Sequence, residues 1–278
     1  MITINPIDVI LWTLRRNERD VVNLYSTLSP VMQLASGGSM LNFGMWSEKC
    51  NEPLMAQNNL CSFFGTMSEL NTAKHVVDVG SGLAAPATLW QNQYPDLNIC
   101  CVNINHKQLV HSKSQTRAAL LNSSSTKLPL MDNSADRVLA LESAQHFKPF
   151  DDFLAESKRI LKKTGLLCMA IPVTRKTSSF KNLGILKFTW SSEHYSLEYV
   201  KDSVMSSGFE ILHESLIGSS VYDPLANYYI QNRSTLKKLI LKKYPPYVEA
   251  ILYKSILKML DASTKNAIDY VLLKCRPM

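Results

Sequence analysis

The stretch from His75 to Ala87 constrains the fold of this chain more than any other. It reads HVVDVGSGLAAPA, so a short and mostly apolar run precedes two glycines. Such a run is typical of a strand buried in a parallel sheet. Gly80 and Gly82 allow a tight turn that most side chains would block, and Pro86 is tolerated in the first turn of a helix. The stretch therefore predicts a strand, a turn and a helix whose free N–H groups face a nucleotide-sized slot.

Apolar strands and helical segments alternate after residue 74, which is typical of a parallel sheet with crossover helices. We expect strands at 75–79, 98–103, 136–141, 166–172, 209–217 and 267–274, and helices at 84–93, 106–120, 151–163 and 196–207. A further strand between 120 and 128 is hard to place, because the run from Asn122 to Thr126 has little apolar character. The pattern predicts the α/β class.

The segments on either side of this alternation read as helical covers. Apolar spacing predicts a helix over 6–29 with a polar break at 15–20, and a second helix over 54–70. Late in the chain, about 220–262 reads as lid helices interrupted at Pro224 and at Pro245–Pro246, and 174–194 reads as a loop or lid. We therefore expect three parts: an N-terminal helical cover (1–72), a core (73–173), and the remainder of the sheet with inserted lid helices (174–278).

Composition excludes some classes of protein. The chain has 278 residues, of which 46% are hydrophobic, enough for one large domain with additions. No apolar run reaches the length of about 18 residues that a membrane span needs, and no signal peptide is recognised, so we expect a cytoplasmic protein. None of the six cysteines is in CxxC spacing, which favours reduced thiols over a metal site or disulfides.

The net charge of +7 favours anionic partners. No arginine-rich arm or zinc-finger pattern is present, which argues against nucleic acid. Lysines cluster with leucines at 235–258, as in an amphipathic helix that contacts an anionic membrane surface. The alternative for this cluster is a solvated face of a lid helix. The sequence does not predict the oligomeric state.

Polar side chains follow the predicted strands at the sheet edge where α/β proteins bind ligands. Asn103 ends one strand, and Glu142 and His146 follow another. His146 is the first candidate for a general base, because an imidazole titrates near neutral pH, and His194 is the second. The alternatives are an ordinary strand-end turn for Asn103 and a loop-capping role for His146.

Together these stretches resemble the class I S-adenosylmethionine (SAM)-dependent methyltransferases. The match is narrower to their small-molecule branch, which includes sterol and tocopherol C-methyltransferases and natural-product or sugar O-methyltransferases. The matching segments are VVDVGSGLAAPA, CVNINHKQL, KLPLMDNSADRVLALESAQHF and FLAESKRILKKTGLL, and they cover 75–173 densely. The acid inside the strand, two residues before the first glycine, separates this pattern from the dinucleotide fingerprint. The resemblance implies a Rossmann-like, mostly parallel seven-stranded sheet with flanking helices.

The resemblance also implies roles for individual residues. The methionine part of SAM would lie on Asp78, Gly80, Ser81 and Gly82, the ribose on Asn103, Ile104 and Gln108, and the adenine beside Ser124, Thr126 and Leu128, with Glu142 facing the cofactor as well. Glu142 and His146 would face the methyl-transfer site. The family often has acids at the positions of Asn103 and Ser124. Their neutrality here implies weaker SAM binding or more reliance on backbone contacts.

Aromatic side chains fall in the predicted cover and lid, where they would bind the acceptor together with His146 by stacking on cations and packing apolar groups. These residues are Tyr25, Phe43, Trp46, Trp190, Tyr195 and Tyr222. The alternative for each is ordinary core packing.

Three functions follow from this reading. The first is SAM-dependent methylation of a small-molecule acceptor, with O-methylation favoured, S-adenosyl-L-homocysteine as product, and no metal. The second is C- or N-methylation of an isoprenoid or phospholipid at a membrane surface. The third is a non-catalytic binding protein with the same fold.

Overall fold

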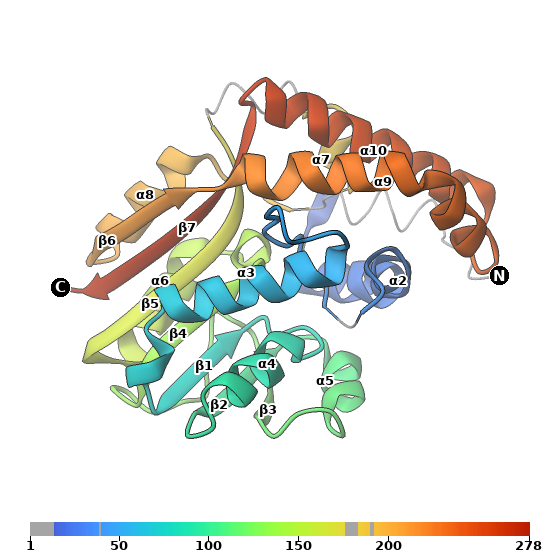
Figure 1. The fold of residues 1–278 in the computed structure, drawn as a ribbon. Coiled ribbons are helices and arrows are strands. Elements are labelled where there is room, and N and C mark those ends of the chain that lie inside the picture. The colour runs from blue at the N-terminus through green and yellow to red at the C-terminus, as the bar shows by residue number, and fades with distance from the viewer. Residues whose placement is uncertain (1–13, 39, 176–182, 190–191) are drawn as a thin grey trace.

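The computed structural model describes residues 14–38, 40–175, 183–189 and 192–278 (Figure 1). Within these ranges one seven-stranded sheet has the order β3-β2-β1-β4-β5-β7-β6. Its strands are β1 (His75–Val79), β2 (Asn98–Asn103), β3 (Ala119–Asn122), β4 (Ala135–Leu141), β5 (Leu161–Thr174), β6 (Phe209–Leu216) and β7 (Ile268–Pro277). Strands β1 to β5 pair in parallel, and β7 runs antiparallel to both of its neighbours. The predicted Rossmann-like, mostly parallel sheet is confirmed.

Helices cover both faces of the sheet. The core on one face joins the sheet to α3 (Pro53–Met67), α4 (Ala85–Gln93), α9 (Gly218–Leu241) and α10 (Pro246–Thr264). The core on the other face joins it to α6 (Phe150–Ile160) and α8 (Leu197–Ser206). The shorter elements are α5 (His106–Ser112), α7 (Leu186–Thr189), η1 (Leu70–Thr72) and η2 (Ala144–His146). Among the helices of the described residues, none combines the length and apolar character needed to cross a bilayer.

Helix α2 (Glu18–Ser36) lies away from both core faces, near the carboxyl ends of the first strands (Figure 1). It begins at an Asn17 cap, so the predicted polar break before it is present. The part of that prediction before residue 14 lies outside the described residues. Helices α9 and α10 are inserted between β6 and β7 and extend together beyond the sheet, over α2 (Figure 1).

Two predicted helices are too long. Helix α5 ends at Ser112 rather than at 120, because the chain there turns to form β3, whose Leu120 and Leu121 pair with β2. Helix α6 ends at Ile160 rather than at 163, because Leu161 already pairs with Ala135 of β4. In both cases strand pairing takes over residues whose local pattern is compatible with helix.

The predicted interruption at Pro224 is wrong, since α9 continues through it. A proline inside a helix leaves the carbonyl four residues earlier without its N–H partner. Here that carbonyl belongs to Ser220, and it accepts a hydrogen bond from the Trp46 backbone N–H at 2.8 Å. A segment from the N-terminal cover thus replaces the missing helical hydrogen bond. The break at Pro245–Pro246, by contrast, separates α9 from α10.

Candidate active site

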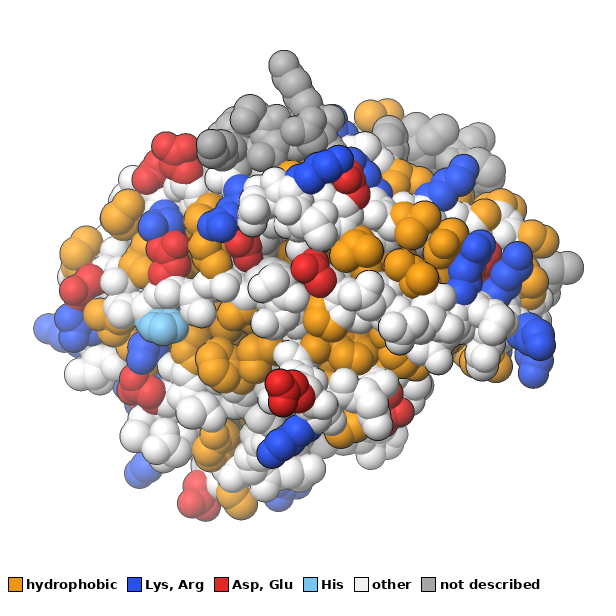
Figure 2. All heavy atoms as spheres, turned by 45° about the horizontal axis from the view of Figure 1, so that its top comes forward, with side chains coloured by type: hydrophobic (Ala, Val, Ile, Leu, Met, Phe, Trp, Pro, Cys, Tyr) orange, Lys and Arg blue, Asp and Glu red, His pale blue; other side chains and the backbone are white. Residues whose placement is uncertain are grey.

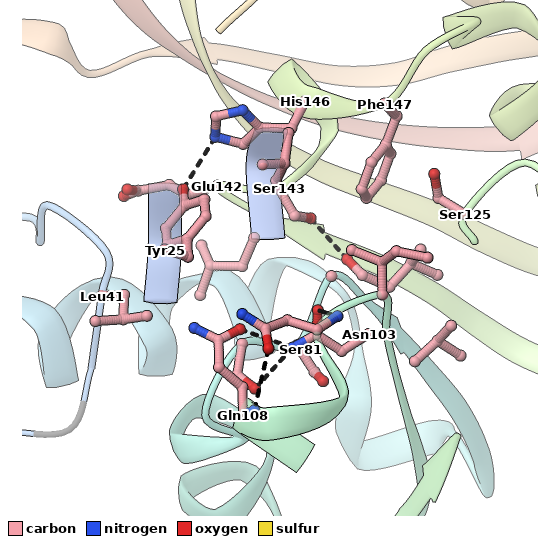
Figure 3. Close-up of a pocket in the computed structure, with 18 of the residues that line it drawn as sticks. Tyr25, Leu41, Ser81, Asn103, Gln108, Ser125, Glu142, Ser143, His146 and Phe147 are labelled. Atoms are coloured by element: carbon pink, nitrogen blue, oxygen red, sulfur yellow. Dashed lines mark hydrogen bonds between the residues drawn. The ribbon is translucent and has the colours of Figure 1, made fainter. Parts of the chain in front are cut away.

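A cavity lies at the carboxyl ends of β1, β2 and β4, with α2 along one side (Figure 3). The strand order reverses between β1 and β4, which is where open α/β sheets bind ligands. The space between the cavity's lining atoms amounts to about 1000 Å³, open solvent included. Its lining mixes polar and apolar groups, among them Val22, Tyr25, Met40, Leu41, Asn42, Gly80, Ser81, Gly82, Asn103, Ile104, Gln108, Ser123, Ser125, Glu142, Ser143, His146 and Phe147.

The glycine turn after β1 forms the floor of this cavity. Gly80 has φ 76° and Gly82 has φ 56°, in the left-handed region that glycine adopts without strain. A Cβ on Gly80 would lie 2.4 Å from Cβ of Ser143, so no larger residue fits there. The N–H groups of Gly80 and Ser81 both donate to the Val102 carbonyl, at 2.7 and 3.1 Å. The turn is therefore fixed against β2 and lies close to the end of β4.

Asp78 lies behind the turn rather than in the cavity wall. Successive strand residues alternate between faces, and Asp78 shares its face with Val76, which packs in the core beside α3 and α4. Its side chain is buried, and this burial raises the pKa of Asp78 to about 7. Its predicted contact with the cofactor is therefore not direct in this geometry.

Asn103 braces the glycine turn. Its Nδ2 donates to the Gly82 carbonyl at 3.0 Å and to Oε1 of Gln108 at 2.9 Å, while its Oδ1 accepts from the Asn105 N–H at 3.2 Å. Gln108 in turn donates to the Ser29 hydroxyl of α2 at 3.3 Å. Both amide hydrogens of Asn103 are thus used within the protein, and only its oxygen is left to meet a ligand.

His146 and Tyr25 meet on the other side of the cavity (Figure 3). The Tyr25 hydroxyl lies 2.9 Å from Nε2 of His146, and the rings meet edge to face at 5.4 Å between centroids. His146 ends the short turn η2 that follows β4, whereas Tyr25 belongs to α2. Burial and the nearby Glu142 carboxylate raise the pKa of Tyr25 far above its usual value, so the hydroxyl keeps its proton.

Glu142 ties three segments together. Its carboxylate accepts the Phe43 N–H at 2.9 and 3.0 Å and the Tyr270 hydroxyl at 2.8 Å. Burial raises the pKa of Glu142 to about 8 even though both of these hydrogen bonds lower it. Glu142 lines the cavity, but its partners hold the 40–46 segment and β7 in place, so its described contacts are structural.

The segment after β3 approaches the cavity with residues other than those predicted. Ser123 and Ser125 line it, whereas Ser124 donates to Glu18 of α2 and pairs with the Thr126 hydroxyl at 2.9 Å. The side chain of Leu128 is buried in the core. The one-residue offset arises because Ser124 bonds to Thr126 and to Glu18 of α2 instead of facing the cavity.

Comparison with known proteins places this geometry in a family. The family profile described as "Methyltransferase domain" matches residues 77–169. Erythromycin 3''-O-methyltransferase of Saccharopolyspora erythraea is 23% identical over 96% of this chain and 92% of that protein. Methyltransferase GfsG of Streptomyces halstedii is 24% identical over 70% of this chain and 74% of that protein.

The chain is a SAM-dependent methyltransferase whose methyltransferase domain spans residues 77–169. The crystal structure of the [4+2]-cyclase SpnF has the same fold, with a TM-score of 0.76, 18% identity, and coverage of 94% of this chain and 96% of that one. Membership of the family implies SAM as the cofactor. The cavity fits it, because a Cβ at Gly82 would meet only Leu41, at 3.8 Å, so its absence leaves open space in the floor. Hydroxyl and amide groups stand beside apolar walls, as a nucleoside joined to methionine requires.

Several predicted residues of this methyltransferase lie away from the cavity. His194 is buried elsewhere, and burial followed by the charge of Arg16 lowers its pKa to about 4. Tyr195 donates to the Phe147 carbonyl at 2.8 Å, and Tyr222 donates to the Asp269 carbonyl at 3.1 Å. Trp46 packs against Tyr228. Phe43 contacts the cavity residue Glu142 through its backbone N–H, which donates to the Glu142 carboxylate. Trp190 lies outside the described residues.

Residues 40–42 line the methyltransferase cavity but were not predicted from the sequence. Met40, Leu41 and Asn42 line it, immediately before the aromatic segment that the sequence singled out. They lie in an irregular segment with no periodicity, so only their position beside that aromatic segment could have pointed to them. Ser143, which packs beside Gly80, follows Glu142 directly and was detectable by the same adjacency.

Proposed function

We propose that this protein methylates a hydroxyl oxygen of a small natural-product acceptor, with His146 as the general base. The observation that carries the proposal is the Tyr25–His146 pair, which lines the cavity on the side away from the glycine turn. A cofactor on the turn and a hydroxyl at this pair would share one enclosed space. Alignment of the two reactants in such a space is the main source of rate in methyl transfer.

Residues of the glycine turn and the neighbouring strand ends would hold the cofactor. The backbone of Gly80, Ser81 and Gly82 would bind the methionine part, and Oδ1 of Asn103 with Ile104 would meet the ribose. Ser123 and Ser125 would border the adenine, in place of Ser124 and Thr126. Bound SAM supplies an electrophilic methyl group on a sulfonium.

The Tyr25–His146 pair would remove the acceptor's proton. The Tyr25 hydroxyl can donate to Nε2 of His146 and accept from an acceptor hydroxyl at the same time. As the acceptor oxygen forms its bond to carbon, its proton passes to Tyr25, and the Tyr25 proton passes to His146. Tyr25 ends neutral, and His146 ends with the positive charge that the sulfonium would lose when its bond to the methyl group breaks, so the charges balance. A positioned general base contributes about 10²–10⁴-fold to such a rate.

The lining and the relatives support the class of acceptor. Val22, Met40, Leu41 and Phe147 give the cavity an apolar wall beside the His146 pair, which suits an acceptor with an apolar body and a hydroxyl. The relative from Saccharopolyspora erythraea is named for O-methylation at the 3'' position of erythromycin. A glycosylated, hydroxylated natural product is therefore the acceptor class that we propose.

The proposal is tested with His146→Ala and a matched control, His213→Ala, at an exposed position on β6. Calorimetry with SAM measures cofactor binding, and release of S-adenosylhomocysteine in the presence of 3''-O-desmethyl erythromycin and related glycosides measures turnover. We expect His146→Ala to bind SAM like the wild type and to turn over at least about tenfold more slowly. Unchanged turnover would remove His146 from the mechanism. No SAM binding at millimolar ligand would favour the non-catalytic reading.

C- or N-methylation of an isoprenoid or phospholipid is the second candidate. The lysine-rich 235–258 region, much of which is exposed on α9 and α10, supports it. Mass spectrometry of the product separates the two candidates, because it shows whether the new methyl group is attached to oxygen, carbon or nitrogen.

A further inference from the structure

Much of the protein's net charge is carried by one helical hairpin. We define the basic hairpin as residues 224–260, which comprise most of α9, the turn at Pro245, and most of α10. It contains seven lysines and arginines against one acid, Glu249, while the whole chain has a net charge of +7. Glu249 is buried and bonded to Arg233 at 2.8 Å, so it neutralises Arg233 rather than the exposed lysines.

Lysines and large apolar side chains alternate on the outer face of this hairpin. The exposed lysines are Lys237, Lys238, Lys242, Lys243 and Lys254. Among them, Leu239 and Leu241 are each 36% exposed, and Tyr247 and Ile251 are each 44% exposed. In Figure 2 basic and apolar side chains share the surface toward the free end of the hairpin. Single exposed apolar residues are ordinary, but apolar residues grouped among lysines are the pattern of a helix face that binds an anionic membrane surface.

The inner face of the same hairpin packs on the helix that lines the cavity. Ile240, Tyr244 and Val248 are buried against Leu24 and Val31 of α2. These inner residues hold the hairpin on α2. The hairpin therefore packs directly on the helix that carries Tyr25.

We propose that the outer face of the basic hairpin docks on an anionic lipid bilayer. Leu239, Leu241, Tyr247 and Ile251 would enter the headgroup region, and the lysines would lie over lipid phosphates with their alkyl stems along the apolar boundary. A protein partner fits less well, because protein interfaces are depleted in lysine and enriched in arginine, and every exposed base here is lysine. A nucleic acid offers the four apolar side chains no apolar region to enter.

Docking in this way would bring the α2 side of the cavity near the membrane. An acceptor with an apolar body, which partitions into a bilayer, would then be concentrated where the enzyme needs it. This consequence rests on the proposed function, whereas the docking itself does not. A vesicle-binding measurement therefore tests the docking, and a methyl-transfer assay separately tests the proposed function.

Co-sedimentation of the full chain with vesicles tests the docking. The probes are vesicles of phosphatidylcholine alone and of phosphatidylcholine with phosphatidylglycerol. The variant K237Q/K238Q/K242Q/K243Q is compared with a control that loses equal charge at exposed lysines elsewhere, K107Q/K113Q/K127Q/K163Q. A third variant, Tyr247→Ser with Ile251→Ser, tests the apolar contribution. Calorimetry with SAM shows whether each variant keeps its fold.

We expect the wild type to bind only the anionic vesicles, less tightly as salt rises, and the hairpin lysine variant to bind at least about tenfold more weakly than the control. The Tyr247 and Ile251 variant should lose the binding that remains at high salt. If both lysine variants lost vesicle binding to the same extent, the binding would depend on net charge alone, and the proposal would be overturned. Retention on immobilised polyglutamate through the hairpin lysines, without vesicle binding, would make the partner an acidic protein and overturn it too.

Discussion

The Tyr25 hydroxyl lies 2.9 Å from Nε2 of His146, although 121 positions separate the two residues in the chain. Tyr25 comes from α2, before the sheet begins, and His146 comes from the turn after β4. Helix α2 also bonds to Gln108, through Ser29, and to Ser124, through Glu18. A single helix thus contacts the proposed base, the brace of the glycine turn and the side proposed for the adenine, so the cavity is complete only when α2 is in place.

Tyr25→Phe should lower turnover by about 10- to 100-fold while leaving SAM affinity nearly unchanged. The variant keeps the ring that packs edge to face on His146 but removes the hydroxyl that passes the proton. Steady-state kinetics together with calorimetry measure both effects. Tyr199→Phe, at an exposed tyrosine of α8, is the control. An equal loss of SAM affinity would show instead that Tyr25 acts by holding α2 on the cavity.

The sheet and the glycine turn could be predicted from the sequence because each depends on neighbouring residues in the chain. The apolar run before Gly80 is unambiguous, and the positions of Asn103 and His146 at strand ends follow from the alternation of elements. The partners of these residues were not predictable, because Ser29 and Tyr25 come from a helix whose place depends on tertiary packing. The same limit explains Ser124, whose direction is decided by Glu18 of α2.

Asn103→Asp should destabilise the protein by about 1–3 kcal/mol. The wild-type amide donates to the Gly82 carbonyl and to Gln108. Gln108 can turn its amide to face a carboxylate, but the Gly82 carbonyl would then lose its donor and meet an acceptor. Urea unfolding of the variant measures the cost. A variant as stable as the wild type would show that the brace on Gly82 does not matter and that an acid is acceptable at this position.

Asp78 should make the protein less stable as the pH rises. Burial raises the pKa of Asp78 to about 7, whereas an aspartate in an unfolded chain titrates near 3.9. Between these values the folded state holds a proton that the unfolded state has lost. The contribution of Asp78 is therefore fully present below the unfolded pKa and is lost as pH rises through about 7. Glu142, whose pKa burial raises to about 8, extends the same trend upward.

Asp78→Asn removes this titration, so the variant should gain on the wild type by up to about 3 kcal/mol between about pH 5 and pH 8. Unfolding free energies measured at both values give the difference. Asp202→Asn, at an exposed position on α8, should show no such gain. A gain of the same size in both variants would assign the effect to net charge rather than to the burial of Asp78.

Gly80→Ala should abolish SAM binding. Gly37→Ala is the control, because it introduces the same backbone strain without a steric clash. The two glycines have nearly the same φ, 76° and 75°, so both substitutions carry the strain of a left-handed alanine, about 1–2 kcal/mol. A Cβ at Gly37 meets nothing within 4 Å, whereas one at Gly80 lies 2.4 Å from Cβ of Ser143. Ser143 cannot move away freely, because its hydroxyl donates to the Val79 carbonyl at 2.6 Å.

Unfolding measurements should therefore show a cost of roughly 1–3 kcal/mol for Gly80→Ala beyond that of Gly37→Ala. Calorimetry should show SAM binding lost in the first variant and retained in the second, because relief of the clash displaces the turn that forms the cavity floor. If Gly80→Ala binds SAM as tightly as Gly37→Ala does, the turn does not hold the cofactor. The methionine part of SAM would then have to lie against another wall of the cavity.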